Sequence, residues 1–120
     1  MAVVQNSEAS DSTARVVVQN AYKVYKQQGM TGLQKFSGVF HDALKKFKTF
    51  DLLEKCAMID QFGGILDYAV SKSNGSPRTP YFSGDNVANR LIPWFKAMNV
   101  SDDMYHTWAK EVTKEMKLLK

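Results

Sequence analysis

Hydrophobic residues recur at helical spacing along most of the chain, and turn-forming residues divide the pattern into five segments. The clearest segment begins near Thr31, which we expect at the N-cap, and continues to Phe47. Its hydrophobic residues follow one another at steps of three and four, so they share one face of an α-helix. This face comprises Leu33, Phe36, Val39, Phe40, Ala43, Leu44 and Phe47. Each phenylalanine ring is worth roughly 2 kcal/mol when buried, so we expect this face in the core and His41 on the polar side.

The segment before it, from about Thr13 to Gln27, has a less distinct pattern. Val16, Val17 and Val18 have strand character because β-branched side chains are stiff. The apolar pattern continues past the length of a usual strand, which favours a helix that stops at Gly29. Residues 1 to 12 are rich in Ser, Asn and Ala, and we expect a flexible tail there before a domain of residues 13 to 120.

The third segment, from about Asp51 to Ser71, is hydrophobic nearly all the way round. A helix of this kind belongs at the centre of a bundle. Gly63 and Gly64 interrupt its pattern, and each costs about 1 kcal/mol relative to alanine in a helix interior. The pair either permits close approach of a neighbouring helix or divides the segment in two.

A long loop, Ser71 to Gly84, comes next, because Pro and Gly residues argue against regular structure there. We expect Asp85 to cap the fourth segment and Pro93 to kink it or divide it. Ser101 is the expected N-cap of the fifth segment. The pattern predicts an all-α fold: a compact single-domain bundle of about five helices, the third central, with a long loop between the third and the fourth.

The composition limits the kinds of functional site that the chain can form. The chain is 44% hydrophobic and 23% charged, which is typical of a globular domain, and it has one cysteine and two histidines. A single cysteine excludes an internal disulfide framework and a cysteine-based zinc site. No phosphate-binding loop or zinc-protease motif is present, and Cys56 lies in the most apolar segment, where a thiol is inert. We therefore expect no enzyme, no metal and no cofactor.

The chain is also expected to remain outside the bilayer. Its mean hydropathy is −0.34, and no long uncharged apolar run is present, so we predict no membrane span. The first residues lack the basic and apolar regions of a secretory signal. These features favour a cytoplasmic protein in which Cys56 is a free thiol.

The leading hypothesis is a non-enzymatic helical interaction module that docks a macromolecular partner or self-associates. Seven Phe, five Tyr and two Trp are many for so small a core, and aromatic side chains beside lysines are typical of docking surfaces. The candidate anchors are Trp94, Phe95, Tyr105, Trp108, Tyr81 and Phe82. The same residues at helical spacing equally fit the core.

The alternative hypothesis is a basic nucleic-acid-binding protein, an RNA binder or a nucleoprotein-complex subunit. The formal net charge is +4, and six lysines lie between Asn20 and Lys48 against Asp42 alone. The candidate phosphate contacts are Lys35, Lys45, Lys46, Lys48, Lys72, Arg78, Arg90 and Lys96. Because lysines outnumber arginines, we expect contact with the backbone of RNA or another polyanion in place of base reading. Complementarity with the acidic third segment, or a solvated face, would also explain the lysines.

Overall fold

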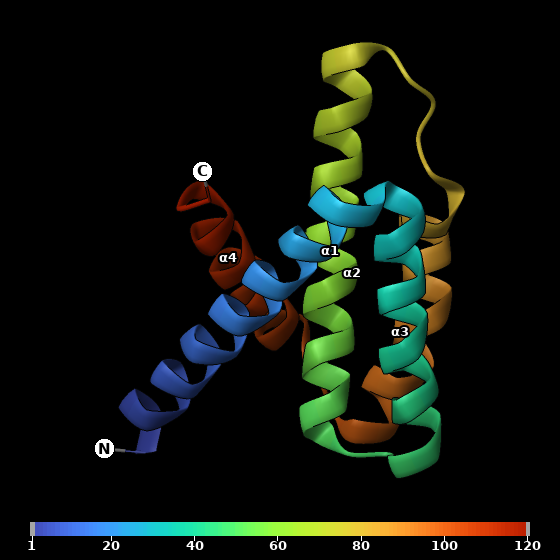
Figure 1. The fold of residues 1–120 in the computed structure, drawn as a ribbon. Coiled ribbons are helices and arrows are strands. Elements are labelled where there is room, and N and C mark those ends of the chain that lie inside the picture. Colours follow the sequence, from blue (N-terminus) through green and yellow to red (C-terminus); the bar gives the residue numbers. More distant parts are fainter. Residues whose placement is uncertain (1, 120) are drawn as a thin grey trace.

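The chain folds into an all-α bundle, as the sequence predicted (Figure 1). The computed structural model describes the backbone of residues 2–119 and the side chains of residues 12–119. The elements are α1 (Ala2–Phe47), α2 (Phe50–Asn74), the short 3-10 helix η1 (Pro80–Phe82), α3 (Gly84–Met98) and α4 (Asp102–Lys117). Residues 2–119 contain no strand. Within the same residues, no helix is long and apolar enough to cross a bilayer, as predicted.

The first two predicted segments are two helices that meet at a kink and share the label α1. Gly29 has φ 71° and ψ −165°, a backbone conformation outside the helical region that glycine adopts readily. The chain changes direction there (Figure 1). Gly29 therefore separates the two segments as predicted, but Met30 and Thr31 are already helical, so Thr31 is not the N-cap of the second helix. The predicted flexible tail, residues 1–12, lies largely outside the described side chains; the backbone is helical from Ala2, and mobility there stays a prediction.

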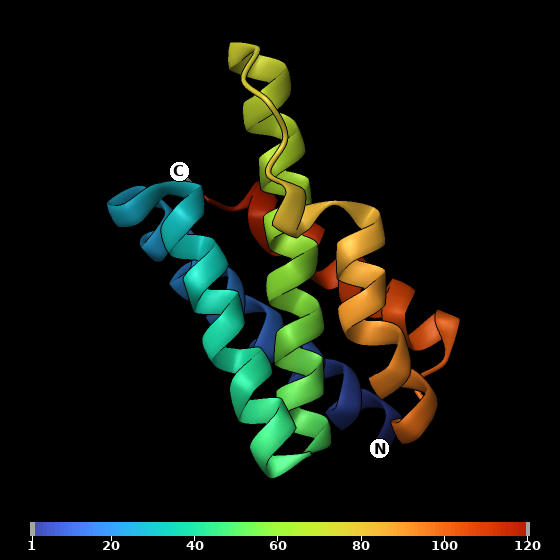
Figure 2. The same cartoon turned by 90° about the vertical axis from the view of Figure 1, so that its right-hand side faces the viewer.

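Helix α2 is the centre of the bundle, as its apolar sequence predicted. It contacts α1, α3, α4 and η1, and in Figure 2 the second part of α1 lies on one side of it and α3 on the other. Its buried side chains include Leu53, Met58, Ile59 and Phe62. The apolar face predicted for residues 31–47 is only partly correct, because Val39 and Phe47 are 65% and 61% exposed.

Gly63 and Gly64 do not divide α2. A Cβ atom added at Gly63 would lie 2.2 Å from Cε1 of Phe82, so the bare backbone leaves room for this ring. Phe82 is fully buried against α2. The close-approach alternative is therefore correct, although the neighbour is a ring of η1 and not another helix.

The predicted loop is wrong in extent, because α2 continues through Ser71 and Lys72 to Asn74. Gly75 ends the helix with φ 73°, and its N–H donates to the carbonyl of Ser71. Residues 75–79 are irregular, and η1 begins directly after them. The last turns of α2 project beyond the other helices (Figure 1).

Ser83, not Asp85, caps α3, and its Oγ accepts a hydrogen bond from the N–H of Asn86 at 3.3 Å. The expected division at Pro93 is wrong, since α3 continues to Met98. Pro93 and Asn89 are both exposed, so water can take the hydrogen bond that the proline removes. Ser101 caps α4 as predicted.

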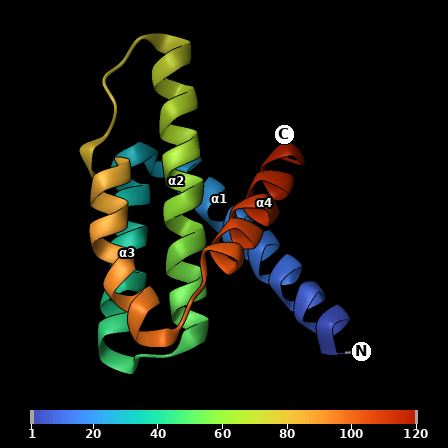
Figure 3. The same cartoon turned by 180° about the vertical axis from the view of Figure 1, so that it is seen from behind.

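Helix α4 then turns away from α3 and crosses α1 (Figures 1 and 3). It packs on α1 and α2, and Arg15 of α1 forms an ion pair with Glu115 of α4 at 3.5 Å.

We expect the two central glycines to respond oppositely to alanine. Gly63→Ala should lower the free energy of unfolding by about 1–3 kcal/mol, because the methyl group overlaps the Phe82 ring. At Gly64 the nearest atom to an added Cβ is the Phe82 carbonyl oxygen at 3.6 Å, an ordinary contact. Gly64→Ala should therefore stabilise the helix by up to about 1 kcal/mol. Urea unfolding of both variants checks this, and equal effects would contradict the packing of Phe82 on Gly63.

Candidate functional site

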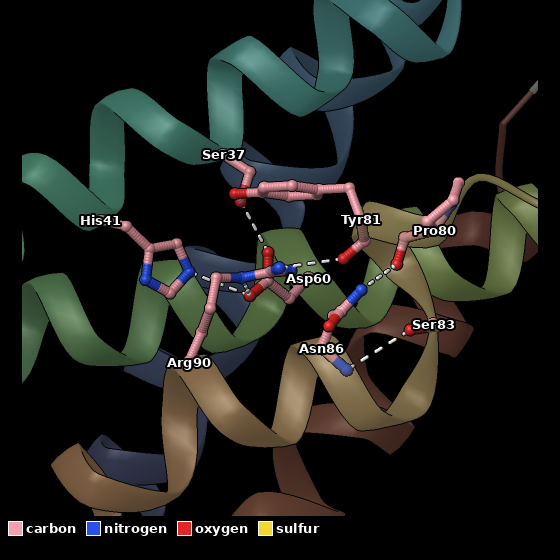
Figure 4. A network of polar contacts seen from close by, with 8 residues as sticks. All are labelled: Ser37, His41, Asp60, Pro80, Tyr81, Ser83, Asn86 and Arg90. Atoms are coloured by element: carbon pink, nitrogen blue, oxygen red, sulfur yellow. Dashed lines mark hydrogen bonds and ion pairs between the residues drawn. The ribbon is translucent and has the colours of Figure 1, made fainter.

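A buried carboxylate lies at the centre of a polar cluster (Figure 4). Asp60 of α2 is 1% exposed. Its Oδ1 accepts a hydrogen bond from Ser37 Oγ at 2.6 Å, and its Oδ2 accepts from His41 Nε2 at 2.9 Å. Arg90 Nε donates to the same Oδ2 at 3.3 Å. Donors from α1 and α3 thus compensate the buried charge.

The sequence produces this convergence through helical spacing. Ser37 and His41 are four residues apart in α1, so both reach the side that faces α2. Both are buried, which corrects the expectation that His41 lies on the polar side. Arg90 lies in the middle of α3 and approaches Asp60 from the other flank (Figure 4).

Tyr81 of η1 closes the cluster. The Arg90 guanidinium lies over its ring, 3.7 Å from the centroid, and Arg90 Nη1 donates to the Tyr81 carbonyl at 2.9 Å. The Tyr81 hydroxyl is 2.8 Å from Ser37 Oγ. Since Ser37 donates to Asp60, Tyr81 must donate to Ser37. Burial raises the pKa of Tyr81, so this phenol keeps its proton at neutral pH.

The cluster contains the residue types of a serine hydrolase without their geometry. A catalytic serine needs a histidine that takes its proton, but Ser37 and His41 each bind the carboxylate of Asp60. Nearby Cys56 is fully buried, and burial with the Asp60 charge raises its pKa to about 12. Such a thiol is no nucleophile at neutral pH. Within the described residues, no three His, Cys, Asp or Glu side chains converge to hold a metal ion.

A second buried carboxylate fixes the connection between α2 and η1. Asp67 accepts a hydrogen bond from Arg78 Nε at 2.8 Å and from the backbone N–H of Thr79 at 3.0 Å. Burial alone would raise the pKa of Asp67, but these hydrogen bonds outweigh it and hold the pKa below its ordinary value. Arg78 also lies over the ring of Tyr68.

The residues predicted to bind nucleic acid do not form one surface. Arg78 and Arg90 are in the ion pairs with Asp67 and Asp60. Lys72 lies in the projecting end of α2, whereas the α1–α2 turn and the end of α3 lie at the opposite end of the bundle (Figure 1). Four exposed lysines belong to that opposite end: Lys45, Lys46, Lys48 and Lys96. Lys35 is exposed on α1.

The aromatic residues predicted as partner anchors divide between core and surface. Phe82 and Trp108 are each 2% exposed and belong to the core. Trp94, Phe95, Tyr81 and Tyr105 are partly buried and pack against it. Of these, Phe95 and Tyr105 line a recess. Their role in binding a partner stays a prediction.

The recess lies where α3 and α4 diverge, and its volume is about 270 Å³. Most of its lining is apolar, and Asp102 contributes the charge. The lining consists of Gly84, Val87, Ala88, Ile92, Phe95, Asp102 and Tyr105. Ile92 is 45% exposed at this recess, so a large hydrophobic side chain meets solvent there.

The Asp60 cluster was not predicted from the sequence. One signal in the sequence pointed to it. Asp60 is a charged residue within the most apolar segment, and a buried charge requires a partner. Ser37 and His41 also lie four residues apart beside the apolar face of their helix.

Compared with models of known protein families, with curated proteins and with solved structures, the chain matches none of them.

We expect Asp60→Asn to lower the free energy of unfolding by about 3–5 kcal/mol, because the guanidinium of Arg90 would lose the buried carboxylate charge that compensates it. Asp42→Asn is the control, since Asp42 is exposed on α1, and it should change stability by less than about 0.5 kcal/mol. Urea unfolding measures both. Similar effects of the two substitutions would show that the cluster contributes nothing to stability.

The lowered pKa of Asp67 predicts an acid-sensitive contribution to stability. This contribution is fully present above the ordinary carboxyl pKa of about 3.9 and is lost as the pH falls through the lower, folded-state value. Asp67→Asn should cost about 1–2 kcal/mol at pH 7, a modest value because Arg78 is 45% exposed. The difference between variant and wild type should shrink below about pH 4. Urea titrations from pH 2 to 7 test this, and a pH-independent difference would contradict it.

Proposed function

We propose that the protein is a non-enzymatic interaction module that docks a partner protein in the recess between α3 and α4. The observation that carries the proposal is the apolar lining of that recess, with Ile92 and Phe95 on α3 and Tyr105 on α4. Its volume of about 270 Å³ suits one large apolar side chain. Hydrophobic anchors seated in such pockets supply most of the binding energy at protein interfaces.

The charges around the recess indicate the partner. Asp102 is the charged residue of its lining. A carboxylate beside an apolar floor favours an amphipathic segment that carries an apolar anchor and a flanking Lys or Arg residue. We therefore propose a basic amphipathic helix as the docked element.

The polar groups of the interior support a non-enzymatic role. Asp60 and Asp67 are buried, and their oxygens accept hydrogen bonds from the protein's own side chains and backbone. Ser37, His41 and Cys56 are buried as well. These groups hold the fold together, and none of them lines the recess between α3 and α4.

Selection from a displayed library of helical peptides tests the proposal. The enriched peptides should combine a large apolar residue with Lys or Arg, and Ile92→Asp should weaken their binding at least about tenfold. Val39→Asp is the matched control, because it places the same charge at another exposed aliphatic residue, 65% exposed on α1. It should leave binding unchanged.

Two outcomes would contradict the proposal. Peptides that bind wild type and Ile92→Asp equally would show that the recess is not the docking site. A dimer that Ile92→Asp dissociates, seen by sedimentation of the protein alone, would make a second copy of the chain the occupant.

A further inference from the structure

The turn between α1 and α2 combines exposed rings with exposed lysines. Phe47 and Phe50 are 61% and 44% exposed. Lys45, Lys46 and Lys48 are all exposed within the same six residues. The turn lies at one extremity of the bundle, away from the projecting end of α2 (Figures 1 and 2). Phe50 packs on Trp108, with ring centroids 5.8 Å apart, but both Phe47 and Phe50 leave much of their apolar surface in water.

The local charge is positive. No acidic residue lies between Ala43 and Phe50. The nearest carboxylates in sequence are Asp42, which is exposed on α1, and Asp51, which forms an ion pair with Lys55 at 2.9 Å. Lys96, in the last turn of α3, adds a further exposed charge at the same end of the bundle. The turn is therefore complementary to an anionic surface.

Lys48 occupies a backbone position that does not favour lysine. Its φ is 54°, the left-handed conformation in which glycine or asparagine usually ends a helix. Its N–H donates to the carbonyl of Leu44 at 2.8 Å, so this is the end of α1. Glycine would serve local folding at least as well. The charge of Lys48 suits the negative end of the α1 dipole, but the left-handed backbone at this position does not require a lysine.

We propose that this turn, residues 45–50, binds the surface of an anionic membrane. Phe47 and Phe50 enter the interface between headgroups and acyl chains, and the lysines contact the anionic headgroups. A convex tip fits a planar surface, whereas single-stranded nucleic acids usually lie along a charged groove. Lysines at the edge of an apolar tip are typical of peripheral membrane binding, which requires no spanning helix.

Vesicle co-sedimentation in 0.1 M salt tests the proposal with two lipid compositions, phosphatidylcholine alone and phosphatidylcholine with 30% phosphatidylserine. The protein should bind only the second. Neutralising a lysine at an anionic surface weakens binding about fivefold, so K45Q/K46Q/K48Q should nearly abolish it. Phe47→Ser should weaken binding about tenfold. The control K23Q/K26Q/K72Q has the same net charge, with exposed lysines changed elsewhere, and should bind within about threefold of wild type.

Lys48→Gly separates binding from folding. Glycine suits the left-handed backbone at this position, so the Tm should be no lower than that of wild type, while vesicle binding should fall about fivefold. No binding to phosphatidylserine vesicles, or equal losses in the two triple variants, would overturn the proposal. Tighter binding of a 20-nucleotide oligouridylate than of vesicles, with loss in K45Q/K46Q/K48Q, would overturn it in favour of nucleic acid.

Discussion

The buried carboxylate of Asp60 is the constraint on which the arrangement of the helices depends. An uncompensated charge in the interior costs several kcal/mol, so donors must be brought to it. Ser37 and His41 come from α1 and Arg90 comes from α3. Tyr81 of η1 is held by Arg90 and Ser37. The cluster therefore fixes α1, α3 and η1 against α2 at one register. Hydrophobic packing alone would define this register less sharply, because apolar contacts have little directionality.

That register also positions the neighbouring residues of η1 and of the connection before it. With Tyr81 held at the cluster, Phe82 is placed over Gly63, where the missing side chain leaves room for the ring. The short connection before η1 is fixed in turn by Asp67, which binds Arg78 and the backbone of Thr79. The interior polar groups thus position the helices and the connection before η1. What remains for interaction with other molecules is at the surface, where α3 and α4 diverge and where α1 turns into α2.

The sequence predicted the features that depend on local periodicity and on single turn residues. The all-α class, the central third segment, the helix stop at Gly29 and the cap at Ser101 are correct. Prediction from the sequence failed where a structural feature depends on contacts between different elements of the chain. The role of Ser37, the ring packed on Gly63 and the ion pair of Arg78 all involve partners far along the chain, which periodicity does not reveal. The division expected at Pro93 failed for another reason, because the carbonyl of Asn89 that loses its helical partner is on an exposed residue and can bind water.

The two proposed surfaces are joined by aromatic rings. Phe50 of the α1–α2 turn contacts buried Trp108, with ring centroids 5.8 Å apart. Trp108 also contacts Phe95, which lines the recess and packs on Tyr105 at 5.2 Å. A ligand that moves Phe95 therefore acts on Trp108, which also contacts Phe50. Any free-energy coupling through Trp108 must be reciprocal, since linkage requires that each ligand change the affinity for the other by the same factor. Because Trp108 is fully packed, such coupling requires the core to have a second arrangement of these rings; a rigid cluster would leave the two surfaces independent.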